Sequence, residues 1–290
     1  MDYIDLHVHS NASDGTLSPQ EVVELAVNSG IRTIALTDHD TLDGIPEAVA
    51  AAEAFHLQGH LIQIIAGVEL SVSYQQRDIH ILGLFLDPKN ETLNAALHKA
   101  KQNRDQRNDR MADKLRAANI DISVDKIRAV EGDAVLTRAH FAKYLVEHGY
   151  SKNNQEAFNR YLNNDSPYYV SREYLSPKEA ISLIHQAGGL AILAHPLLYK
   201  YSLNEVELLV SYLAGFELDG IEAIYTSNSG FDEGRMRHLA NKYNLIITGG
   251  SDFHGANKPD IHLGTGRGNL KIPYTVLTDI KNRHSNIYIS

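Results

Sequence analysis

The stretch IDLHVHS, residues 4–10, sets two histidines directly after a short predicted strand. Residues 4–6 favour the strand, and an extended segment turns His7 and His9 to the same side because side chains alternate along a strand. Buried imidazoles and carboxylates need polar partners, so a strand end that carries two such groups has no simple structural explanation. The spacing therefore indicates a pair of metal ligands.

The same pattern recurs after other predicted strands. Strand-favouring runs cover residues 33–36, 61–68, 190–193 and 245–248, and the polar residues that follow them are Asp38, His39 and Asp40; Glu69; His195; and Asp252 and His254. The carboxyl ends of parallel strands share one rim, where active sites gather. We therefore expect five segments to bring metal ligands together. His80 is the exception, because it begins the predicted strand 79–85, which favours an antiparallel direction for that strand.

Predicted strands and helices alternate through most of the chain, which is typical of a mainly parallel α/β sheet, either open or closed into a barrel. Residues 93–118 interrupt this pattern with a long, highly charged predicted helix, and polar helical sequence continues to about residue 164. We expect a discontinuous α/β domain of residues 1–98 and 169–290, with residues 99–168 as an inserted, mainly helical domain that caps the substrate.

Composition narrows the function classes. The 290 residues carry a formal net charge of −9, which argues against broad binding of duplex DNA. The chain has no cysteine, so any metal must be held by nitrogen and oxygen ligands. No apolar run is long enough to span a bilayer, and the first residues lack a basic region followed by an apolar stretch. We therefore expect a cytoplasmic protein without a membrane partner.

Six stretches, in order along the chain, resemble the motifs of the PHP (polymerase and histidinol phosphatase) family. They are DLHVHS (5–10), SDG (13–15), TDHD (37–40), GVE (67–69), AHP (194–196) and GSDFH (250–254). The similarity covers nearly the whole chain and includes the insertion. It implies an α/β fold, a distorted (βα)7 barrel with an inserted helical domain, and a site for three metal ions.

The resemblance also implies which residues hold each ion. One ion would take His7, His9, Glu69 and Asp252; a second would share Glu69 and add His80 and His195; a third would take Asp14, His39 and His254. Glu69, Asp252 and His195 would act in catalysis through the metals. Asp14 enters only through the resemblance, because Ser-Asp-Gly is also an ordinary turn sequence. Asp38 and Asp40 are expected to orient ligating histidines from behind, although Asp40 fits a helix cap equally well.

These ligands suit the hydrolysis of phosphate esters. Clustered divalent ions neutralise phosphate oxygens, lower the pKa of a bridging water and align the attacking and leaving oxygens. Histidine and carboxylate ligands suit Mn²⁺, Fe²⁺ and Zn²⁺. We predict a hydrolase that holds two or three divalent ions, with Mn²⁺ favoured, and that attacks phosphate monoesters with metal-activated hydroxide.

The insertion is expected to select the substrate. The stretch LTRAH, residues 136–140, resembles an Arg-x-His segment in one PHP branch, in which the middle residue is usually proline rather than Ala139. That branch includes phosphatases of nucleoside 3′,5′-bisphosphates and 5′→3′ exoribonucleases of short RNA. The metals would then receive the 3′-phosphate, while Arg138, with His140 nearby, binds the 5′-phosphate. Arg138 also fits a solvated helix position.

Three alternatives stay open at this point. A 5′→3′ exonuclease acting on short single-stranded RNA or DNA would use the same metal site. A histidinol-phosphate phosphatase would share the metal motifs but would not need the insertion. A non-catalytic PHP module that supports a partner protein could dispense with some ligands, whereas every motif ligand is present here.

Overall fold

The structure is a computed structural model that describes residues 3–288. Within this range seven strands form one sheet in chain order: β1 (Tyr3–Val8), β2 (Ile31–Leu36), β3 (Gln63–Tyr74), β4 (Arg77–Leu84), β5 (Leu190–Leu193), β6 (Gly220–Tyr225) and β7 (Ile246–Gly250). Strand β4 runs antiparallel to β3 and β5, and the other adjacent strands are parallel. The antiparallel direction predicted from His80 is therefore confirmed.

The sheet curls until β1 meets the chain that follows β7. The backbone N–H of Asp252 donates to the carbonyl of His7 at 2.9 Å, and the N–H of His9 donates to the carbonyl of Phe253 at 3.0 Å. Gly250 permits this approach, because a Cβ at that position would lie 2.2 Å from the Cβ of His7. The predicted fold, a distorted seven-stranded α/β barrel, is confirmed.

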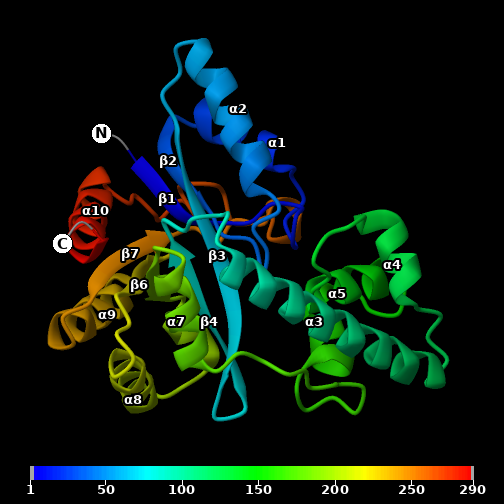
Figure 1. The fold of residues 1–290 in the computed structure, drawn as a ribbon. Coiled ribbons are helices and arrows are strands. Elements are labelled where there is room, and N and C mark those ends of the chain that lie inside the picture. Colours follow the sequence, from blue (N-terminus) through cyan, green and yellow to red (C-terminus); the bar gives the residue numbers. More distant parts are fainter. Residues whose placement is uncertain (1–2, 289–290) are drawn as a thin grey trace.

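Helices surround the barrel (Figure 1). They are α1 (Pro19–Asn28), α2 (Ile45–Leu57), α7 (Pro177–Gln186), α8 (Leu203–Ala214), α9 (Gly230–Lys242) and α10 (Tyr274–Tyr288), with short 3-10 turns η2 (Pro196–Tyr199) and η3 (Gly255–Asn257). Ser18 and Ser176 begin α1 and α7 with capping boxes, as their Ser-Pro-x-Glu patterns predict. No helix in the described part of the chain combines the length and the apolar character needed to cross a membrane.

Two apolar clusters divide the barrel into an inside and an outside. On β5, Leu190 and Ile192 join a cluster that α10 also enters, whereas Ala191 and Leu193 pack with the surrounding helices. Side chains alternate between the two faces of a strand, so the apolar neighbours of a polar residue show which face it occupies. Each polar strand residue that stands between two residues of the outer cluster points into the barrel.

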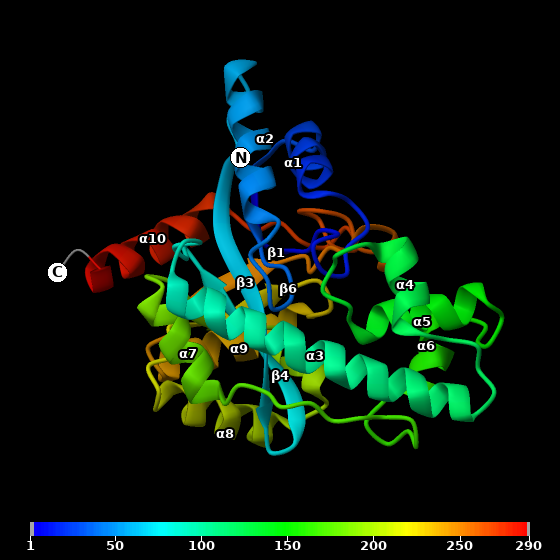
Figure 2. The same cartoon turned by 45° about the vertical axis from the view of Figure 1, so that its right-hand side comes forward.

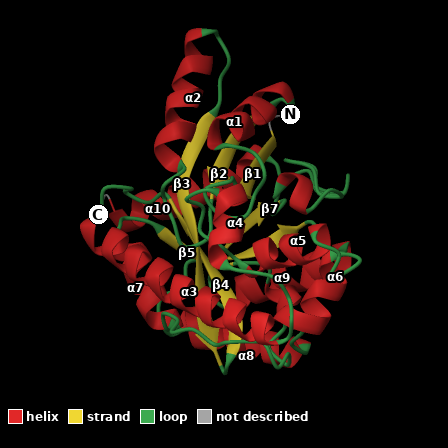
Figure 3. Cartoon of the chain, turned by 90° about the vertical axis from the view of Figure 1, so that its right-hand side faces the viewer, coloured by secondary structure: helices red, strands yellow, loops and turns green. Residues whose placement is uncertain are grey.

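The insertion has an apolar cluster of its own. The helices that contribute to this cluster are α3 (Glu91–Ala117), α4 (Val124–Glu131), α5 (Arg138–Glu147), α6 (Asn154–Ala157) and the π-helical turn η1 (Phe158–Leu162). Figures 1 and 2 show α3 leaving the barrel and carrying α4 and α5 to one side of it, and Figure 3 views the same helices from that side. Because α3 continues across the predicted boundary between residues 98 and 99, the domain division stays a prediction.

Candidate metal centre

The predicted ligands converge inside one end of the barrel. His7 lies within β1, because β1 continues to Val8, and Glu69 lies within β3, because β3 pairs with β4 as a hairpin as far as Tyr74. The prediction that these two residues follow their strands was therefore wrong by a few positions. Glu69 stands between Val68 and Leu70 of the outer apolar cluster, so its carboxylate points into the barrel.

Glu69 is the central carboxylate of the group, and imidazole nitrogens lie around both of its oxygens. Its Oε2 lies 3.3 Å from His7 Nε2, 3.2 Å from His9 Nε2 and 3.2 Å from His39 Nδ1, and its Oε1 lies 2.7 Å from His80 Nδ1 and 2.8 Å from His195 Nε2. One oxygen is thus shared by three rings and the other by two. A carboxylate in this arrangement can bridge two cations.

Asp252 completes the side of the group that His7 and His9 face. Its Oδ1 lies 3.6 Å from His7 Nε2 and 3.5 Å from His9 Nε2. Its Oδ2 accepts hydrogen bonds from the Tyr225 hydroxyl at 2.7 Å and the Lys258 ammonium at 2.6 Å. Asp252 adopts a left-handed backbone, with φ of 59°. Such strain in a non-glycine residue is typical of functional sites, where the surrounding contacts hold the conformation.

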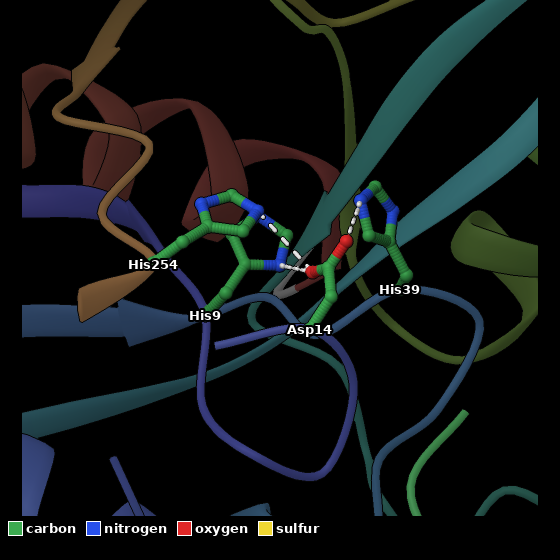
Figure 4. Close-up of side chains that lie close together, drawn as sticks. All are labelled: His9, Asp14, His39 and His254. Atoms are coloured by element: carbon green, nitrogen blue, oxygen red, sulfur yellow. Dashed lines mark ion pairs between the residues drawn. The ribbon is translucent and has the colours of Figure 1, made fainter. Parts of the chain in front are cut away.

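Asp14 gathers the remaining predicted ligands (Figure 4). Its Oδ1 lies 3.2 Å from His254 Nε2 and 3.8 Å from His9 Nδ1, and its Oδ2 lies 3.7 Å from His39 Nε2. Gly15 lets this loop fold back tightly, because a Cβ there would lie 2.6 Å from the His9 carbonyl oxygen. The Ser-Asp-Gly turn therefore aims its carboxylate at three histidines.

Several contacts in this group indicate that cations belong there. The Nε2 atoms of His7 and His9 approach to 3.1 Å, a distance at which two neutral ring nitrogens need a proton or a metal to share. Among the described residues, His9 Nδ1, His39 Nδ1 and Asp14 Oδ1 are buried without a hydrogen-bond partner. Buried polar atoms are rarely left unsatisfied. A nitrogen and oxygen donor set of this kind fits borderline divalent cations.

Three sets of ligand atoms lie close enough to hold an ion, with every atom of a set within 4.8 Å of the others. They are His9, Asp14, His39 and His254; His7, His9 and Glu69; and His39, Glu69 and His80. They approximate the three predicted ligand groups, and His9, His39 and Glu69 each belong to two sets.

The pKa values of His9, His39 and Glu69 agree with metal binding. Burial lowers the pKa of His9 well below its usual value and that of His39 to about 4, so both rings are neutral at pH 7 and can act as ligands. Burial opposes ionisation of Glu69, but the neighbouring His39, His80 and His7 outweigh it and hold the carboxyl pKa well below its ordinary range. The Glu69 carboxylate is therefore ionised.

Glu222 is a buried site residue that the sequence reasoning missed. Its Oε1 lies 3.0 Å from His7 Nδ1, and its Oε2 accepts a hydrogen bond of 2.8 Å from the backbone N–H of His195. Burial alone would lower the pKa of His7, but the charges of Glu222 and Glu69 raise it well above its usual value. The signal was one acidic residue within the otherwise apolar strand run 220–225.

Asp38 and Asp40 contact groups other than the histidine rings that they were expected to orient. Asp38 accepts hydrogen bonds from the Ser10 and Ser13 hydroxyls, each at 2.6 Å, and so anchors the loop that carries Asp14. Asp40 accepts from the backbone N–H of Ser71 and from two arginines. It does not cap α2, whose first residue has no side-chain cap. The ring of His7 instead contacts Glu222, and the ring of His254 contacts the backbone carbonyl of Asp252.

A cavity of about 410 Å³ adjoins the cluster. We call the lining residues Asp14, His39, His80 and His254 the metal-ligand wall. We call the four lining arginines, Arg104, Arg107, Arg138 and Arg172, the arginine wall. Only Arg138 of the four was predicted. The others were missed because α3 has the charge density of a solvated helix, and Arg172 stands in an irregular segment.

The two predicted substrate contacts differ in their surroundings. Arg138, at the start of α5, lines the cavity, and its guanidinium donates to Asp78 and Asn164, both at 2.9 Å. His140 is buried, and its Nδ1 accepts from the backbone N–H of Thr137 in a capping box. His140 is not among the residues that line the cavity within the described range, so its contact with substrate stays a prediction.

The insertion also touches the metal-ligand loop directly. The Thr137 hydroxyl donates to Asp14 Oδ2 at 3.0 Å, and the backbone N–H of Val135 donates to the Ala12 carbonyl at 3.0 Å. The loop before α5 is therefore fastened to the loop that presents Asp14.

A scan against protein-family models matches residues 5–173 to the PHP domain. The chain belongs to the PHP family. This confirms the resemblance drawn from the six motifs. The matched residues cover more than half of the chain and include the insertion.

Relatives and a solved PHP structure agree with this assignment. The chain is 39% identical to a 5′-3′ exoribonuclease of Haemophilus influenzae, over 86% of this chain and 89% of the relative. It is 37% identical to a 3′,5′-nucleoside bisphosphate phosphatase of Chromobacterium violaceum, over 87% of each. A crystal structure from Bifidobacterium adolescentis, assigned as a metal-dependent phosphoesterase, aligns with a TM-score of 0.84 at 29% identity, over 97% of this chain and 96% of the other.

The PHP protein described here is a metal-dependent hydrolase of phosphoric esters, as the sequence predicts. Its His, Asp and Glu clusters are able to bind metal ions.

Proposed function

We propose that this PHP protein hydrolyses phosphate monoesters of nucleotides, with the 3′-phosphate of a nucleoside 3′,5′-bisphosphate as the group removed. The observation that carries the proposal is the single cavity that joins the metal-ligand wall to the arginine wall. Such a cavity suits a ligand with one phosphate to be hydrolysed and a second phosphate to be held. The relative named as a bisphosphate phosphatase acts on a molecule of this class. Nucleotides are available in the cytoplasm, the location expected from the sequence.

We propose two or three divalent ions, with Mn²⁺ favoured over Fe²⁺ or Zn²⁺. His7, His9, Glu69 and Asp252 would hold one ion; Glu69, His80 and His195 a second; and Asp14, His39 and His254 a third. When bound, the ions would neutralise phosphate oxygens and activate water. His7, His9 and His39 present ring nitrogens on both sides of the shared carboxylate oxygen, which supports a bridging role for Glu69.

The protein's own residues would position the substrate. Lys258 and Tyr225 fix Asp252 from behind through its Oδ2 oxygen, so its Oδ1 stays turned toward the histidines. We propose that residues 99–168 act as a domain that caps the substrate against the barrel formed by residues 1–98 and 169–290. Arg138 would contribute to the second phosphate from the edge of this cap, with His140 behind it.

A second function, 5′→3′ exonuclease activity on short single-stranded oligonucleotides, is favoured by a groove next to the cavity. This groove, of about 1020 Å³, shares Asp78, Arg138, Arg172 and Tyr174 with the cavity and continues past Tyr169. Aromatic rings beside cations are typical of surfaces that bind single strands, and Tyr169 and Tyr174 are half-buried here. The relative named as an exoribonuclease supports the same activity.

A phosphate-release assay with the Mn²⁺-loaded protein tests the proposal. The panel comprises adenosine 3′,5′-bisphosphate, adenosine 3′-monophosphate, histidinol phosphate and a short RNA, each with and without a chelator. We expect fastest release from the bisphosphate, with adenosine 5′-monophosphate as the product, and no release after chelation. A preference for histidinol phosphate, or release that survives complete metal removal, would contradict the proposed function.

A further inference from the structure

The arginine wall holds more positive charge than the carboxylates around it can balance. Asp40 is shared by Arg104 and by Arg172, whose NH2 lies 3.1 Å from the Oδ2 of that carboxylate. Asp78 pairs with Arg138 at 2.9 Å. Four guanidinium groups therefore face two carboxylates, and the wall carries a net charge of about +2.

Arg107 is the arginine of this wall that has no carboxylate partner among the described residues. It is 2% exposed, and in the described part of the chain its guanidinium has no ion pair and its Nε has no hydrogen-bond partner. A buried charge without a partner is unfavourable by several kcal/mol unless something compensates it. Burial, and then the neighbouring Arg104, Arg138 and Arg172, lower the pKa of Arg107 to about 9, so the group stays cationic at pH 7.

The position of Arg107 points it at the same space as the metal ligands. Arg104 and Arg107 are three residues apart on α3 and so share one helix face. Both line the cavity that also contains His39, His80 and His254. A ligand in this cavity can touch the metal-ligand wall with one anionic group and Arg107 with another.

We infer that Arg107, flanked by Arg104 and Arg172, is the main binding site for the non-scissile phosphate of the substrate. The inference rests on the proposed function and names the residue that would select for the second phosphate. A phosphate monoester carries a charge of about −1.5 to −2 at pH 7, which matches the excess on the wall. Arg138 contributes less, because its guanidinium already donates to Asp78, Asn164 and the Leu162 carbonyl.

The test compares Arg107→Met with Arg110→Met, a control at an exposed arginine one turn further along α3. The metal-loaded proteins, at equal metal content, are assayed with adenosine 3′,5′-bisphosphate and adenosine 3′-monophosphate. We expect Arg107→Met to lower kcat/KM for the bisphosphate by roughly 10- to 100-fold, and the loss for the monophosphate to be at least ten times smaller. Equal losses on both substrates, or no loss on either, would overturn the assignment.

A binding measurement separates failure of this inference from failure of the proposed function. Adenosine 5′-monophosphate is titrated into chelator-treated protein. Without metal ions, only the arginine wall can bind its phosphate. We expect the unmodified protein and Arg110→Met to bind it, and Arg107→Met to bind at least tenfold more weakly. If neither nucleotide is hydrolysed, the proposed function fails while this titration still tests the site. No binding by the unmodified protein, or equal binding by Arg107→Met, would overturn the inference.

Discussion

The two walls of the cavity are built from different parts of the molecule and balance their charges differently. The metal-ligand wall comes from the barrel and its loops, and its members contact one another, as Asp14 and His254 do at 3.2 Å. The arginine wall comes from α3, α5 and the segment before α7, and one of its members, Arg107, has no ion-pair partner within the described residues. Under the proposed function, the barrel would supply the groups for hydrolysis, and the insertion would supply most of the groups that select the substrate.

This division predicts that substitutions on the two walls have separable effects. A change among the metal ligands should lower the hydrolysis of every substrate together with metal content. A change on the arginine wall should leave metal content intact and act most strongly on substrates with two phosphates.

The largest effect is expected from Glu69→Gln. The amide cannot bridge two cations with charged oxygens, so metal content and turnover should fall together, with kcat down by roughly 100-fold or more on all substrates. Metal analysis beside the phosphate-release assay checks this, with Glu53→Gln, an exposed position on α2, as the control. Lost activity at full metal content would indicate an acid/base role instead, and unchanged activity would remove Glu69 from the site.

An intermediate effect is expected from Glu222→Gln. Glu222 accepts from both the His7 ring and the His195 backbone, and an amide can accept only one of these bonds while presenting an oxygen. Metal affinity should fall by roughly 10- to 100-fold, the usual effect of removing a group that orients a ligand. Titration against a metal-competing dye measures it.

The control for this substitution is Glu217→Gln, exposed in the turn before β6. Turnover of Glu222→Gln should recover at saturating metal, because the chemical step uses the same ligands. A lower turnover at unchanged metal affinity would show that Glu222 acts on the reaction and not on His7.

The sequence predicts the barrel well because its signals are local. The predicted strand 190–193 has the bounds of β5, because it is a continuous apolar run. Helix α10 was not predicted, since only a few apolar side chains such as Leu277 and Ile280 mark its buried side. Its role, packing against the barrel interior, depends on distant contacts.

The candidate site divides in the same manner. Candidate ligands in dense motifs such as residues 5–10 could be predicted because two polar groups at a strand end are unusual. Glu222 and Arg107 were missed, because one glutamate in a strand and one arginine in a charged helix are common in sequences. Their burial becomes apparent only in the fold, which places Glu222 against His7 inside the barrel and Arg107 at the cavity.

A smaller effect is expected from Arg138→Met. Because this guanidinium already pairs with Asp78 and Asn164, its removal should lower kcat/KM for the bisphosphate by less than tenfold, roughly 3- to 10-fold, with metal content unchanged. Parallel kinetics with Arg107→Met rank the two residues. A larger loss in Arg138→Met than in Arg107→Met would move the second phosphate to the edge of the cavity.

The smallest effect is expected in the stability of Arg107→Met without nucleotide. If Arg107 is a buried cation without an anionic partner, its charge destabilises the ligand-free protein. An apolar side chain of similar length should then leave the melting temperature unchanged or raise it by roughly 2–4 °C, about 1 kcal/mol for a chain of this size. Adenosine 5′-monophosphate should then stabilise the unmodified protein more than the variant, because a ligand stabilises a protein only to the extent that it binds the folded state. Thermal unfolding of both chelator-treated proteins, with and without the nucleotide, measures the two effects together. A ligand-free melting temperature that falls by more than about 4 °C would mean that Arg107 already makes stabilising contacts in the empty cavity. Arg107 would then be a residue that stabilises the fold, and not an unpaired cation that binds the substrate.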